Sequence, residues 1–127
     1  MDLNQVTLPA FDMAASVAFY QALGLRQIVA SAHYARFECV QGDATFSLHL
    51  APATQPAGAA VVYFETADLD AQVQRLQALG LEFTQSPRDE AWLWREARLR
   101  DPAGNSVCLY WAGANRKHPP WRLAGPG

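Results

Sequence analysis

Polar side chains that can do chemistry gather on one face of the segment TFSLHL, residues 45–50. Successive side chains of an extended strand point to opposite faces, so its two hydroxyls and its imidazole share a face: Thr45, Ser47 and His49. An imidazole can donate or accept a hydrogen bond, act as a general base, or bind a metal ion. Two interpretations of His49 stay open. It is a functional residue of a ligand site, or its ring is hydrogen-bonded to a neighbouring strand or to Tyr110.

Aromatic and sulfur side chains in the second half of the chain are further candidates. Trp92 and Trp94 share one face of an expected strand over residues 92–99. Their rings either line a pocket for a flat ligand or fill the core or a dimer interface. Cys108 has no base or cationic residue close in sequence that would lower its pKa, which favours a small lining residue over a nucleophile.

A polar face is also expected on a strand in the first half. Tyr34, Arg36 and Glu38 alternate with less polar residues, which is typical of a solvated face, although Arg36 could reach an anionic ligand. His33 and His118 fall in expected turn and tail segments, so we expect both to be exposed.

Several classes of protein lack their usual signatures in this sequence. It contains no GxSxG, P-loop, GxGxxG or HExxH motif. Its 10 basic and 12 acidic residues are mixed, with a net charge of −2, so we expect no nucleic-acid partner. It has no N-terminal signal pattern and no apolar run long enough to cross a bilayer, which predicts a cytoplasmic protein with no membrane partner. Both cysteines, Cys39 and Cys108, are interpreted as thiols.

An internal repeat determines how these residues are positioned. The segment QALGL occurs at residues 21–25 and again at 77–81, an offset of 56. Between residues 6 and 25, nine of 20 positions are identical to their partners at that offset. A duplicated unit determines which surfaces can form a shared site, so we expect function between the two copies.

Each copy predicts the element order βαβββ. The first helix begins after Asp12 and ends at Gly24, and the second begins after Asp68 and ends at Gly80. The expected inward faces of the helices are Met13, Val17 and Tyr20 in the first and Leu69, Val73 and Leu76 in the second. The expected strands span residues 3–8, 27–31, 34–40, 45–50, 61–65, 82–85, 92–99 and 106–111.

The chain is expected to form one domain, residues 1–127, made of two modules. Module one covers about residues 1–50, and the small, uncharged segment 51–60 is the linker. Module two covers about residues 61–112, followed by an irregular tail over 113–127.

Four motifs in this order resemble the vicinal oxygen chelate superfamily: LPxxD, FYxxLGL, FExxDLD and DPAGN. Its members include glyoxalase I, extradiol dioxygenases, fosfomycin-resistance enzymes and bleomycin-resistance proteins. The resemblance spans Leu3 to about Trp111 and implies an α+β fold. Its two tandem βαβββ modules would form an open, barrel-like, curved mixed sheet with a cleft and with the helices outside. It also implies a homodimer.

The resemblance places the four metal ligands of metal-dependent members at Gln5, Ser47, Val61 and Cys108 in this sequence. Only Gln5 matches the residue types expected there. A divalent catalytic site needs three or four donors, whereas Val61 has none and Ser47 is a poor ligand. The sequence therefore predicts no metal and no cofactor.

Alternation adds neighbours of these positions to the expected cleft: Thr7, His49, Tyr63 and Tyr110. The strand around His49, SLHL, also resembles the RLHI-type strand of bleomycin-resistance proteins. A displaced metal centre would use Gln5, His49, Glu65 and Cys108, but Glu65 lies at a strand end, two same-face positions, or about 13 Å, along the strand from Val61.

These observations favour a metal-free protein that sequesters a hydrophobic or aromatic small molecule, as bleomycin-resistance proteins do. The alternative is an enzyme: a glyoxalase-type lyase or isomerase, a dioxygenase-like enzyme with a rearranged metal centre, or a cofactor-free enzyme that uses His49 as base. A third possibility is a partner-binding regulatory domain. The expected ligand-binding residues are Gln5, Thr7, Ser47, His49, Val61, Tyr63, Trp92, Trp94, Cys108 and Tyr110.

Overall fold

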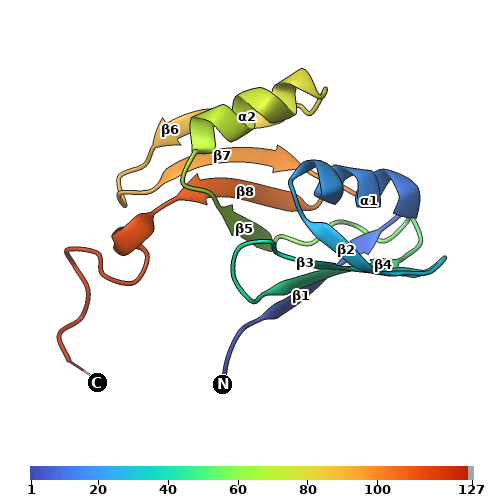
Figure 1. Ribbon diagram of the computed structural model, residues 1–127, viewed down its shortest axis with the longest axis horizontal. Coiled ribbons are helices and arrows are strands. Elements are labelled where there is room, and N and C mark those ends of the chain that lie inside the picture. Colours follow the sequence, from blue (N-terminus) through green and yellow to red (C-terminus); the bar gives the residue numbers. More distant parts are fainter. Residues whose placement is uncertain (126–127) are drawn as a thin grey trace. The chain divides into compact units, whose positions relative to one another are not determined.

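The computed structural model describes residues 1–125, and in them the predicted unit occurs twice (Figure 1). The first copy comprises β1 (Gln5–Ala10), α1 (Met13–Ala22), β2 (Arg26–Ala30), β3 (Tyr34–Glu38) and β4 (Thr45–Leu50). The second comprises β5 (Val61–Glu65), α2 (Leu69–Ala78), β6 (Phe83–Asp89), β7 (Arg95–Arg100) and β8 (Ser106–Trp111). The α+β fold of two βαβββ modules is confirmed.

Both helices begin and end where the repeat predicts. Asp12 accepts a hydrogen bond from the backbone N–H of Ala15 at 3.1 Å, which caps α1. Asp68 occupies the equivalent position before α2 but makes no capping hydrogen bond through its side chain. Gly24 and Gly80 follow the helices with φ of 103° and 95°, a backbone conformation that glycine adopts without steric cost.

The first sheet has the strand order β1-β4-β3-β2. Strand β1 is parallel to β4, and the other neighbours are antiparallel, so the sheet is mixed. The register places Gln5 beside Thr45 and Thr7 beside Ser47. Helix α1 contacts β2, β3 and β4, and it therefore covers one face of this sheet.

The second sheet repeats the pattern with the order β5-β8-β7-β6. Strands β6 and β7 are antiparallel, and helix α2 packs against β6. The chain divides into two compact units, one of residues 1–60 with 100–106 and one of residues 61–99 with the chain from 107 onward. No helix of the described residues is long and apolar enough to cross a membrane.

Aromatic rings fill the core beneath α1. The ring of Tyr20 lies 4.4 Å from that of Phe46 and 6.2 Å from that of Phe37, measured between centroids. Ser16 and Tyr20 are the buried residues of α1, whereas Met13 and Val17 are only half-buried. The predicted face of this helix is thus rotated toward Ser16. In α2 the predicted face is confirmed, since Leu69, Val73 and Leu76 are all buried.

The DPAGN turn belongs to the first unit. Asp101 Oδ1 accepts the backbone N–H groups of Ala103 and Asn105 at 3.0 and 2.9 Å, and its Oδ2 accepts the Asn105 amide at 2.8 Å. The Asn105 amide also donates to the Pro9 carbonyl at 2.9 Å. Gly104 supplies the φ of 84° that closes the turn.

The structure corrects the expectation for Trp92 and Trp94. Strand β7 begins at Arg95, not at residue 92, because residues 91–93 form a turn in which Leu93 has a φ of 67°. The two tryptophans therefore do not share a strand face. Strand β1 begins two residues later than predicted, at Gln5, and part of the tail forms a 3-10 helix over Gly113–Asn115. The last two residues of the predicted tail lie outside the described residues.

Candidate functional site

The face of the first sheet opposite α1 is polar, as alternation along β4 predicts. Phe46 and Leu48 are buried on the helix side, and Ser47 points to the opposite face. Thr7 and His49 on this face are exposed. Within the described residues the imidazole of His49 has no hydrogen-bond partner, and its backbone pairs with Pro9 and Tyr34. His49 is thus available to a ligand.

Gln5 and Ser47, which the sequence placed together, are in direct contact. Gln5 Nε2 donates to Ser47 Oγ at 2.8 Å, and Gln5 Oε1 accepts the hydroxyl of Thr45. Ser47 is fully buried, and its Oγ lies 2.6 Å from Tyr34 Oη. Sequence reasoning assigned Tyr34 to a solvated face. The position of Tyr34 on the polar side of β3, next to β4, could have indicated its contact with Ser47.

Three aromatic rings cluster on the second sheet. Trp94 and Tyr110 are stacked with centroids 4.8 Å apart, and Tyr63 meets both edge-on at 5.9 and 5.5 Å. Val61 and Trp94 pack against the buried residues Cys108 and Tyr110. The cluster thus brings together five of the predicted ligand-binding residues, and Tyr63 keeps 42% of its surface exposed.

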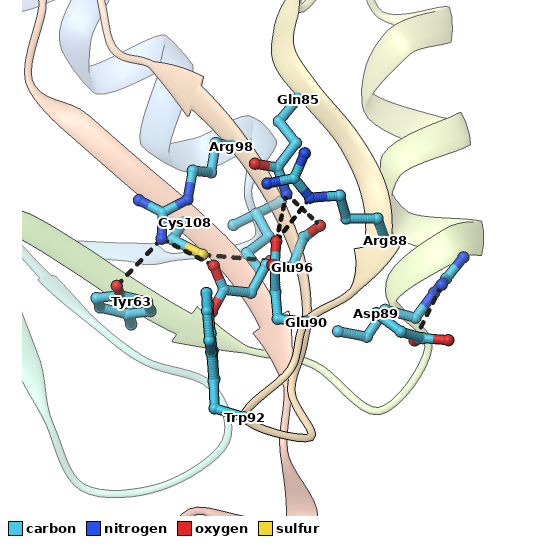
Figure 2. Close-up of polar contacts among 11 residues, drawn as sticks. Tyr63, Gln85, Arg88, Asp89, Glu90, Trp92, Glu96, Arg98 and Cys108 are labelled. Carbon is cyan, nitrogen blue, oxygen red and sulfur yellow. Dashed lines mark hydrogen bonds and ion pairs between the residues drawn. The ribbon is translucent and has the colours of Figure 1, made fainter.

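A partly buried ion pair, which the sequence analysis missed, lies beside Tyr63 (Figure 2). Glu96 is only 1% exposed, and its Oε1 accepts Arg98 Nη2 at 2.8 Å. Its Oε2 accepts the indole N–H of Trp92, also at 2.8 Å. Arg98 also donates to the Tyr63 hydroxyl at 3.3 Å. In the sequence, the alternation of Glu96 and Arg98 with Ala97 and Leu99 could have indicated that the two charged side chains share one face of a strand.

The network extends to the edge strand of the second sheet. Gln85 Nε2 donates to the Glu96 carbonyl at 3.2 Å and to Glu90 Oε1 at 3.3 Å. Arg88 donates to Glu90 at 2.7 Å. Since the carboxylates of Glu96 and Glu90 each have an arginine partner, this face carries paired charges and no large net charge.

Cys108 is a protonated thiol in this environment. The side chain is fully buried, and burial, reinforced by the negative charge of Glu96, raises its pKa to about 12. A metal-binding or nucleophilic cysteine needs the thiolate form. Cys108 therefore acts as a small apolar residue between the aromatic rings and the Glu96 carboxylate.

The residues at the superfamily's metal positions do not fit a metal ion. Val61 has no donor atom, Ser47 is hydrogen-bonded on both sides, and Cys108 is protonated. The carboxylate of Glu65, the donor for a displaced centre, accepts the backbone N–H groups of Ala112 and Gly113 at 2.9 and 3.0 Å. Residues 1–125 contain no group of three or more His, Cys, Asp or Glu side chains that could hold a metal.

Comparison with known proteins assigns the family. The model of the Glyoxalase/Bleomycin resistance protein/Dioxygenase superfamily matches residues 2–109. An uncharacterised protein of Mycolicibacterium smegmatis is 31% identical over 111 residues, which cover 86% of this chain and 92% of that protein.

Solved structures share the fold. Lactoylglutathione lyase from Agrobacterium tumefaciens superposes with a TM-score of 0.72 at 24% identity, covering 87% of this chain and 92% of the lyase. A bleomycin-binding protein in complex with bleomycin superposes with a TM-score of 0.69 at 23% identity, covering 87% and 98% of the two chains. At these identities the likeness extends to the fold alone.

Proposed function

The chain belongs to the Glyoxalase/Bleomycin resistance protein/Dioxygenase superfamily, and we propose that it binds a hydrophobic or aromatic small molecule without a metal ion. One observation carries the proposal: the positions that hold the metal in metal-dependent members have no usable donor set here. Val61 offers no donor, and the Cys108 thiol is kept protonated. Catalysis that depends on that metal would lack its ligands.

The aromatic cluster supports a flat ligand. The exposed ring of Tyr63 stands edge-on to the stacked pair Trp94 and Tyr110. Each offset or edge-on contact with an aromatic group of the ligand adds about 0.5–1.5 kcal/mol to the binding free energy, beyond the contribution of the buried apolar area. Arg98, whose side chain is one-third exposed and is held in place by Glu96, gives this surface a hydrogen-bond donor that can orient a ligand.

The proposal includes a cytoplasmic homodimer. Strands β2 and β6 are edges of their sheets, and Ile28 and Val29 on β2 are 48% and 38% exposed. Uncovered edges promote unwanted pairing, and a second copy would cover them. Light scattering at micromolar concentration should give twice the chain mass of 14.0 kDa. The monomer mass would contradict this part of the proposal.

Elemental analysis and a ligand titration test the main proposal together. We expect less than stoichiometric zinc, nickel, manganese or iron in purified protein, and quenching of tryptophan fluorescence when metal-free bleomycin or a planar aromatic molecule is added. Tyr110→Ala should weaken binding by about 1–3 kcal/mol through lost contact area. Trp121→Ala, in the exposed tail, is the matched control. One bound metal per chain, or turnover that chelation removes and metal restores, would favour the enzyme instead.

A further inference from the structure

A row of hydrogen bonds on the polar face of the first sheet ends at Tyr34. Gln5 Nε2 donates to Ser47 Oγ at 2.8 Å, and Ser47 Oγ lies 2.6 Å from Tyr34 Oη. Ser47 is fully buried, so its hydroxyl proton needs an acceptor. Gln5 presents an N–H to this hydroxyl and cannot accept the proton there. The Ser47 proton is therefore donated to the phenol oxygen of Tyr34.

Arg36 supplies a second donor to the same oxygen. Its Nε donates to Tyr34 Oη at 2.9 Å, and its guanidinium carbon lies 5.4 Å from the centroid of the Tyr34 ring. With both lone pairs of the phenol oxygen engaged, the proton of Tyr34 points away from Ser47 and Arg36 and is free for a third group. The hydrogen bonds from Ser47 and Arg36 also lower the pKa of Tyr34, which makes its hydroxyl a better donor.

The positive charge of Arg36 lacks an acidic partner within residues 1–125. Five other arginines lie within 4.0 Å of a carboxylate oxygen: Arg26, Arg88, Arg95, Arg98 and Arg116. Glu38, two positions along β3 from Arg36, is already engaged by Arg26 at 3.1 Å. The exposed guanidinium of Arg36 thus gives the face around Tyr34 an uncompensated positive charge.

We propose that Tyr34 and Arg36 form a subsite that binds the oxyanion, a carboxylate or a phosphate, of a small-molecule ligand. The Tyr34 hydroxyl donates one hydrogen bond, and the outer nitrogens of the Arg36 guanidinium donate others in the fork geometry that suits these groups. The inference rests on the proposed function, that the chain binds a small molecule, and adds to it an anion-binding subsite within the first unit.

The ionisation of Tyr34 reports on the subsite directly. In protein with isotopically labelled tyrosine, the Tyr34 signal is assigned by its loss in Tyr34→Phe and followed by NMR across an alkaline pH titration. A bound anion disfavours the phenolate. Excess benzoate or phenyl phosphate should therefore raise the pKa of Tyr34, whereas benzamide and chloride should leave it unchanged.

Matched variants test affinity with the same probes. Wild-type protein should bind benzoate or phenyl phosphate at least about ten-fold more tightly than benzamide, the scale of a charge-assisted hydrogen bond. Arg36→Gln should abolish this preference and Tyr34→Phe should reduce it. Arg26→Gln removes an exposed arginine from the same sheet and should keep it. A stronger response to one of the two anions identifies it as the ligand's group.

The outcomes separate this inference from the proposed function. Anionic probes that leave the pKa of Tyr34 unchanged would overturn the subsite, even if bleomycin binds. A preference for benzoate that survives in Arg36→Gln would overturn it as well. If bleomycin and benzamide fail to bind while a non-aromatic anion, acetate or inorganic phosphate, still raises the pKa of Tyr34, the aromatic-ligand function fails and the oxyanion subsite stands.

Discussion

The hydroxyl of Tyr20 donates to the carboxylate of Asp101 across 2.6 Å, in the buried interior of the first unit. The two residues are 81 positions apart, and each lies in a different sequence motif. Asp101 also organises its own turn by accepting the backbone N–H groups of Ala103 and Asn105. One hydrogen bond therefore joins the end of helix α1 to the turn between β7 and β8.

Removing that hydroxyl should destabilise the fold without creating a large cavity. Tyr20→Phe keeps the ring among its aromatic neighbours but removes a donor from a buried carboxylate, so the free energy of unfolding should fall by about 1–3 kcal/mol. Urea unfolding measures this change. Tyr63→Phe is the control because that hydroxyl lies on a half-exposed ring, and it should cost less. Equal losses in the two variants would argue against a special role for the Tyr20–Asp101 contact.

Removing the arginine of the Glu96–Arg98 pair should destabilise the fold more than removing the acid. Arg98→Met leaves an unpaired, buried carboxylate, which should lower the free energy of unfolding by about 3 kcal/mol. Glu96→Gln leaves a partly exposed arginine that water can still solvate, so its cost should be smaller. The double variant should recover part of the loss. An Arg98→Met protein as stable as Glu96→Gln would show that the buried carboxylate does not depend on its arginine partner.

The buried thiol of Cys108 should make stability fall at alkaline pH. Its pKa is raised in the folded protein to about 12. The neutral thiol therefore makes its full contribution to the free energy of unfolding below about pH 8.5, the pKa of cysteine in the unfolded chain. That contribution is lost as the pH rises from there toward the pKa of Cys108 in the folded protein. Between pH of about 8 and about 10, wild-type protein should lose more stability than Cys108→Ala, as measured by urea midpoints. If wild-type protein and Cys108→Ala lose the same stability over this pH range, a group other than Cys108 is responsible for the loss.

Equivalent positions of the repeat should differ in their tolerance of charge. Val73 is 2% exposed, whereas its partner Val17 is only half-buried. Val73→Asp should therefore cost several kcal/mol and Val17→Asp clearly less, because a partly exposed carboxylate keeps some of its water. Thermal unfolding of the two variants measures the difference. Equal destabilisation would mean that the repeat symmetry, and not the burial of each site, controls the cost.

Local patterns in the sequence determined most of the fold. The offset between the copies of QALGL, the aspartates that begin each helix and the glycines that end them act within a few residues of chain. For that reason they correctly located both helices, and strand-like runs of residues correctly located strands β4, β5 and β8. The alternation in TFSLHL likewise placed Ser47 opposite the helix-covered face, because strand periodicity depends only on backbone geometry.

Tertiary structure alone decided how side chains far apart in sequence are partnered. The turn at Trp92 and Leu93 shortened β7 and turned one tryptophan toward Glu96, an outcome that strand propensity does not encode. The sequence predicted a solvated face for Tyr34 and Arg36, and Arg36 is exposed, but only the pairing of β3 with β4 placed the two residues beside the buried Ser47. Burial and charge pairing depend on which strands become neighbours, and that is settled only when the whole sheet has assembled.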